Sequence, residues 1–100
     1  MSELYSLSFD SEDNIFRVTG ELTFATVNAL LEQAPDLFEN HHKLNIDLTN
    51  VTRSDSAGLA LLIDWIRLAK NTNKEIMFYN IPAQMLAISN ASGVDELLPV

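Results

Sequence analysis

The sequence of 100 residues contains no cysteine. This absence excludes a disulfide framework, a thiolate nucleophile and a cysteine-ligated zinc site. Its three glycines stand apart from one another, so there is no glycine-rich loop that could cradle a phosphate group. The Gly-x-Ser-x-Gly pattern of hydrolases is also missing, and no histidine stands in a defined relation to Ser56. We therefore expect no enzymatic activity and no cofactor.

Basic residues are scarce. Six lysines and arginines face fourteen aspartates and glutamates, which gives a formal net charge of -8. Such an acidic surface repels phosphate backbones and anionic headgroups, and so disfavours direct binding to nucleic acid or to a lipid surface. A protein partner with a basic patch is favoured instead. His41 and His42 are adjacent and lack the acidic neighbours of a metal site, so we expect solvated loop histidines and no bound metal.

Long apolar runs are absent as well. The longest one, residues 58–63, ends at Asp64 and is far shorter than the ~20 residues of a membrane span. The first six residues lack the basic and apolar regions of a signal peptide. We expect a soluble, cytoplasmic protein without membrane insertion. Its length and its hydrophobic content of 47% predict one globular domain over residues 1–100.

Hydrophobic periodicity predicts the order of the elements. Alternating or continuous apolar residues predict strands at about 5–9, 15–19, 44–48 and 76–79. Helical spacing predicts helices over about 23–34, 56–70 and 82–91. Pro35 and Gly93 are expected to end the first and last helices, and Val94, Leu97 and Leu98 to pack the tail onto the domain.

This order, β-β-α-β-α-β-α, predicts an α/β fold with a small, mixed, mostly parallel four-stranded sheet. The first two strands are expected to form an antiparallel hairpin, whereas strands joined through helices run parallel. Because such crossovers are right-handed, the helices should pack on one face of the sheet.

The helix expected over 56–70 is apolar around more of its circumference than packing on a sheet requires. Leu61, Trp65 and Leu68 widen its apolar arc to roughly 220°, compared with the ~100° stripe of a helix that is buried on one side. Either these side chains pack against another helix of the domain, or they form a docking surface for a second protein, since Trp is enriched at binding hot spots.

The polar residues that precede this helix also allow two interpretations. Asp55 or Ser56 is placed to cap the helix by accepting hydrogen bonds from its first amides. The same position would alternatively expose a hydroxyl in the positive field of the helix N-terminus, where an added phosphate or an anionic partner group is favoured.

Residues 44–59, LNIDLTNVTRSDSAGL, resemble the signature of STAS domains, the anti-sigma-factor-antagonist fold. In this family a strand and a variable loop are followed by Asp-Ser/Thr-x-Gly-Leu, which opens a helix. Gly20-Glu21-Leu22 resembles the family's Gly-Glu-Leu-Asp motif, with Thr23 in place of the aspartate. In anti-sigma factor antagonists the phosphorylated serine directly precedes the glycine of the block, a position that Ala57 occupies here.

Within the family, the chain is most similar to the MlaB branch, the small STAS subunits of a phospholipid ABC transporter of Gram-negative bacteria. Residues 20–27, 55–62, 65–69 and 92–99 carry the similarity. The resemblance implies an accessory subunit that binds a MlaF-like ATPase and, through it, the permease, peripheral to the inner membrane. It also implies a part in maintaining outer-membrane lipid asymmetry, with Ser56 in contact with the ATPase.

The partner-binding residues expected on these grounds are Ser54, Asp55, Ser56, Ala57, Gly58, Leu61, Trp65 and Leu68. The alternative function is that of an anti-sigma factor antagonist, which switches partners with an anti-sigma factor through phosphorylation of Ser54 or Ser56. A homodimer of the isolated domain is also compatible with the sequence.

Overall fold

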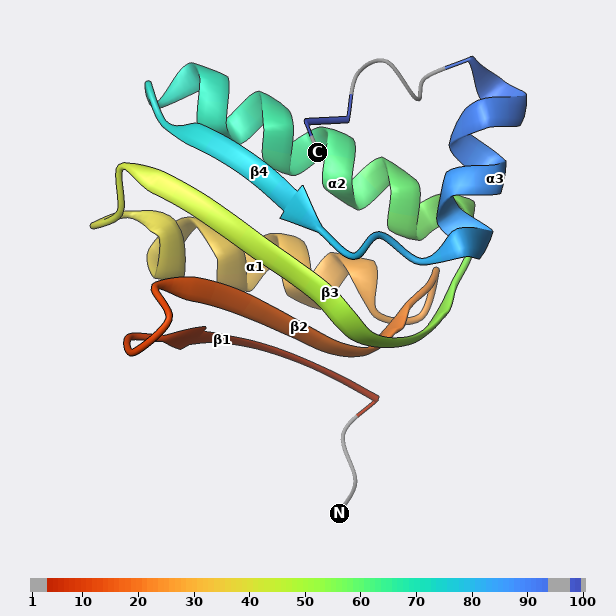
Figure 1. Cartoon of the computed structure of the whole chain (residues 1–100), viewed down its shortest axis with the longest axis horizontal. Coiled ribbons are helices and arrows are strands. Elements are labelled where there is room, and N and C mark those ends of the chain that lie inside the picture. The colour runs from red at the N-terminus through yellow and green to blue at the C-terminus, as the bar shows by residue number, and fades with distance from the viewer. Residues whose placement is uncertain (1–3, 94–97, 100) are drawn as a thin grey trace.

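A mixed four-stranded sheet forms the centre of the structure, a computed structural model that describes residues 4–93, 98 and 99 (Figure 1). The elements in chain order are β1 (Tyr5–Asp10), β2 (Ile15–Leu22), α1 (Val27–Phe38), β3 (Lys43–Ser54), α2 (Ser56–Asn71), β4 (Glu75–Tyr79) and α3 (Ala83–Ser92). The strands lie in the order β1-β2-β3-β4; β1 is antiparallel to β2, whereas β3 is parallel to both its neighbours. This confirms the predicted element order and the mostly parallel sheet.

The core lies between the sheet and the two long helices. Helices α1 and α2 cover one face, and α3 lies near the end of the molecule where α2 begins (Figure 1). Alternate strand residues face these helices and are buried, among them Phe16, Val18, Leu44, Ile46, Leu48 and Phe78. Each such side chain contributes about 1.5–3 kcal/mol by leaving water.

Helix α1 differs from its prediction at both ends. It begins at Val27 rather than near residue 23, and it continues through Pro35 to Phe38. A proline in a helix removes one backbone hydrogen bond. The loss is offset because the Phe38 ring is buried edge-on against Phe16 and Trp65, with ring centroids at 4.9 and 5.6 Å. Tertiary packing therefore holds a last turn that the local sequence disfavours.

Strand β3 is also longer than predicted. Its polar second half, expected to be a loop, pairs with the end of β2 through register pairs that include Gly20 with Val51 and Leu22 with Ser54. These residues lack a strand pattern of their own, and the neighbouring strand supplies the hydrogen bonds that extend them.

The remaining expectations about the chain ends and loops have mixed outcomes. Gly93 ends α3 in the left-handed conformation, with φ of 73°, and Leu98 is buried. Val94 and Leu97 lie outside the described residues. His41 is half-buried against the rings of Phe9 and Phe16 rather than solvated. In the part of the chain that the structure describes, no helix is long and apolar enough to cross a membrane.

Candidate protein-binding site

The candidate site lies at the edge where β2 and β3 end and where α1 and α2 begin (Figure 1). Leu22 pairs with Ser54 in the sheet, so the two strands end side by side. The Asp55 amide then donates a hydrogen bond to the Leu22 carbonyl at 3.2 Å. Residues 23–26 and residues 55–58, which are far apart in the sequence, therefore form neighbouring turns.

Gly58 allows the first turn of α2 to approach β2 closely. A Cβ atom at this position would lie 2.4 Å from the Leu22 carbonyl oxygen and 3.0 Å from the Leu22 Cβ. Real Cβ atoms essentially never approach a backbone atom so closely, and Gly58 itself is buried. The absence of a side chain at Gly58 therefore positions the turn.

Asp55 joins the two turns through its carboxylate. Its Oδ1 accepts hydrogen bonds from the amides of Ala57 and Gly58 at 2.9 and 3.3 Å and so caps α2. Its Oδ2 accepts a hydrogen bond from the amide of Phe24 at 3.2 Å. Of the two residues predicted to cap this helix, Asp55 is the one that does so.

The two serines of the block have different surroundings. Ser56 is the first residue of α2 and is exposed, whereas Ser54 is 2% exposed. The Ser54 hydroxyl has no hydrogen-bond partner among the described residues. The expectation that Ser54 contacts a partner or is phosphorylated is wrong for this conformation, because pairing of β3 with β2 buries it. Ser56 is accessible to either event.

The expectation of a docking surface on the side of α2 needs correction. Leu61 and Trp65 are each 1% exposed, and Trp65 packs edge-on against Phe38 of α1. Helix α2 contacts the sheet and both other helices, so its wide apolar arc is covered from several sides. The alternative in which the arc packs within the domain is therefore correct for Leu61 and Trp65.

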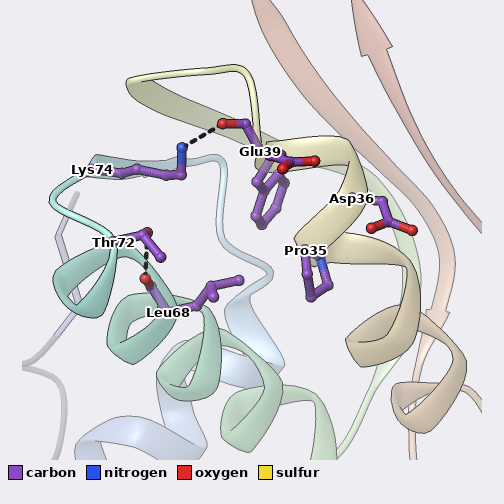
Figure 2. A pocket seen from close by; sticks show the side chains of 7 residues that line it. Pro35, Asp36, Glu39, Leu68, Thr72 and Lys74 are labelled. Atoms are coloured by element: carbon purple, nitrogen blue, oxygen red, sulfur yellow. Dashed lines mark hydrogen bonds between the residues drawn. The ribbon is translucent and has the colours of Figure 1, made fainter.

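Leu68 lies away from the rest of the predicted site. It is half-buried and lines a hollow of about 260 Å³ between the ends of α1 and α2 (Figure 2). It lies twelve positions after Ser56, which corresponds to about 18 Å along the helix. Two polar side chains of the hollow are already bonded to backbone carbonyls. Lys74 Nζ donates to the Glu39 and His41 carbonyls at 3.0 and 2.7 Å, and the Thr72 hydroxyl donates to the Leu68 carbonyl.

Phe24, in the turn at residues 23–26, lies in the candidate site and was not predicted from the sequence. Its side chain is 85% exposed, and its amide is bound to Asp55. The available signal was a large aromatic residue directly after the Gly20-Glu21-Leu22 motif. Hydrophobic periodicity instead assigned this region to the start of the helix, where an aromatic residue is unremarkable.

A charged network lies on the opposite face of the sheet. Arg17, between the inward-facing Phe16 and Val18, donates to Asp47 at 2.9 Å and also pairs with Asp10 and Asp13. Burial of Asp47 raises the pKa of its carboxyl, but hydrogen bonds from Asn80 and Thr49 and the Arg17 charge outweigh burial and hold the pKa below its ordinary value. The carboxylate is thus kept ionised by partners within the domain, which indicates a structural role.

Comparison with known proteins assigns this arrangement to a family. The family model described as "Mlab, STAS domain" matches residues 5–99. The chain belongs to the STAS family. An anti-sigma-B factor antagonist of Staphylococcus epidermidis is 27% identical to it over 85 residues, which cover 84% of this chain and 79% of the relative.

Solved structures share the fold of this STAS domain. The anti-sigma factor antagonist SpoIIAA in its unphosphorylated form superimposes with a TM-score of 0.70 at 14% identity, over 94% of this chain and 84% of that one. SLC26A9 also reaches a TM-score of 0.70, at 18% identity and over 82% of this chain, but the match covers only 16% of the SLC26A9 chain. The predicted fold and family are thereby confirmed.

Proposed function

We propose that this STAS domain is a non-enzymatic subunit that binds the MlaF-like ATPase of a phospholipid ABC transporter through the surface around Ser56. Through the ATPase it would join the permease and support the lipid asymmetry of an outer membrane. The observation that carries the proposal is an exposed Ser56 at the capped N-terminus of α2, followed by Ala57. The description of the matching family model and the resemblance to the MlaB branch support the choice of partner.

Ala57 favours a constitutive subunit over a phosphorylation switch. This position carries the phosphorylated serine in the anti-sigma factor antagonists that the block resembles, and a methyl group cannot accept phosphate. An accessory subunit acts by mass action: it stabilises whichever arrangement of the ATPase binds it more tightly. The net charge of -8 favours a basic patch on that partner.

The second candidate is an anti-sigma factor antagonist, favoured by the relative that is 27% identical. In that case the exposed Ser56 would have to replace the missing hydroxyl at position 57. Phosphorylation would add about -1.5 to -2 charges beside the Asp55 carboxylate. Because Asp55 already occupies the amides of Ala57 and Gly58, the phosphate would gain little from the helix N-terminus.

The test compares binding of the purified chain to two purified proteins of the same organism: the transporter ATPase and a kinase-type anti-sigma factor. Titration calorimetry is expected to show binding to the ATPase. Ser56→Asp should weaken it at least about tenfold, or 1.4 kcal/mol, because the larger, charged side chain must lose its water at the point of contact and stands beside the Asp55 carboxylate. The matched control is Ser11→Asp, which adds the same charge in the exposed hairpin turn at the far end of the sheet.

Two results would contradict the proposal. Unchanged ATPase affinity in Ser56→Asp would remove Ser56 from the docking surface. Binding to the anti-sigma factor alone, together with stoichiometric phosphoserine in protein isolated from cells, would make the second candidate correct.

A further inference from the structure

The turn between β2 and α1 exposes the side chain of Phe24 to an unusual degree. This ring is 85% exposed, whereas the next most exposed large hydrophobic residue in the described ranges, Leu4, is 56% exposed. A ring in this position contributes little to the stability of the fold, since burial is what stabilises an apolar side chain. A polar residue would serve the turn equally well.

The backbone of this turn is held rigidly. Every amide from residue 23 to residue 27 donates a hydrogen bond within the domain. Thr23 and Thr26 are buried and brace the turn: the Thr23 amide donates to the Thr26 hydroxyl at 3.1 Å, and that hydroxyl donates to the Glu21 carbonyl at 2.8 Å. Only the Phe24 side chain remains to be ordered on binding, so the entropic cost of docking is small.

The same turn is joined to the first turn of α2. The Asp55 carboxylate accepts a hydrogen bond from the Phe24 amide through one oxygen and caps α2 through the other. Phe24 and Ser56 therefore belong to one preorganised surface. Protein interfaces are built in this way, with an aromatic anchor surrounded by polar groups that exclude water.

We propose that Phe24 is the apolar anchor of the docking surface, and that it inserts into an apolar pocket with a basic rim on the partner protein. The inference rests on the proposed function for the identity of the partner, the ATPase. The basic rim follows from charge complementarity with a chain of net charge -8. The same charge disfavours a second copy as the occupant, because a symmetric contact would bring two surfaces of net charge -8 together.

The binding test uses Phe24→Ala in the full chain, with the purified transporter ATPase as the probe. The variant should unfold within about 2 °C of the unmodified protein, because the ring is exposed, and should bind the ATPase at least roughly tenfold more weakly. Phe24→Leu should recover most of the affinity. Tyr79→Ala is the matched control, an exposed aromatic residue on the outer face of the sheet, and should bind normally. ATPase affinity within threefold of the unmodified chain in Phe24→Ala would overturn the proposal.

Photocrosslinking in cells tests whether Phe24 contacts a partner, independently of which protein that partner is. A benzophenone amino acid is placed at position 24 in one variant and at position 56 in another. The proposal predicts that both variants label one and the same protein other than this chain. Labelling from position 56 alone, or labelling of a second copy from position 24, would overturn it. If that one protein is not the ATPase and the ATPase does not bind the unmodified chain, the proposed function fails while the anchor stands.

Discussion

Replacing Asp55 with alanine removes two carboxylate oxygens, which together accept three hydrogen bonds. The two bonds to the amides of Ala57 and Gly58 form the N-cap of α2, and loss of such a cap costs about 1 kcal/mol. The third bond, to the Phe24 amide, contributes about another 1 kcal/mol. We therefore expect Asp55→Ala to lower the free energy of unfolding by about 2 kcal/mol and, for a domain of 100 residues, the Tm by roughly 10 °C.

Asp55→Asn divides the two contributions. Asparagine is as good an N-cap as aspartate, so its carbonyl oxygen retains the bonds to the first turn of α2. Its amide nitrogen then faces the Phe24 amide, a donor against a donor, and the tether between the turns is lost. Asp55→Asn should therefore lose about half as much stability as Asp55→Ala.

Urea and thermal unfolding of the three proteins, followed by circular dichroism, measure both effects. If the free energy of unfolding of Asp55→Ala lies within about 0.5 kcal/mol of that of the unmodified protein, neither the cap of α2 nor the bond to the Phe24 amide stabilises the fold as proposed. An Asp55→Asn variant as unstable as Asp55→Ala would refute the division between them. Because Asp55 acts as a positioning residue, Asp55→Asn should also weaken ATPase binding while the folded fraction stays close to one.

The remaining predictions concern the core and the outer face of the sheet. Trp65→Ala should cost about 3–5 kcal/mol in urea unfolding, because the ring is 1% exposed against Phe38; a loss below about 1 kcal/mol would contradict its place in the core. Asp47→Asn should cost about 1–3 kcal/mol at pH 7, since its hydrogen bonds involve a charged group. The pKa of Asp47 is lowered in the folded state, so this stabilisation is complete above the ordinary pKa of about 3.9 and is lost as the pH falls through the folded value. The difference in the free energy of unfolding between Asp47→Asn and the unmodified protein should therefore be smaller below about pH 4 than at pH 7. An equal difference at the two pH values would contradict the lowered pKa of Asp47.

The elements that the sequence predicted well are those whose pattern is local. Helix α2 was expected over 56–70 and spans Ser56–Asn71, because it combines helical spacing with a capping aspartate. Gly93 ends α3 as expected, because glycine adopts the left-handed conformation at low cost. The elements predicted poorly depend on distant partners. The end of β3 requires pairing with β2, and the last turn of α1 requires the buried ring of Phe38.

The candidate site divides in the same way. Its chemistry was apparent from the residues: a block that opens a helix, a capping carboxylate, a serine beside it and an alanine where a phosphorylated serine would stand. Which residues form the exposed surface of the site was not apparent from the sequence. Whether an apolar side chain on α2 faces a partner or the core depends on which other elements pack around the helix, and periodicity within one helix does not record that.

The sequence alone therefore determined the fold and the location of the polar block, because these follow from periodicity and from short motifs that act on neighbouring residues. The resemblance of residues 44–59 to a known signature indicated the family. Only the tertiary structure decided which residues of that block are accessible. It buries Ser54, Leu61 and Trp65 through contacts between elements distant in the chain, and it brings the exposed Phe24 beside Ser56 through the Asp55 carboxylate.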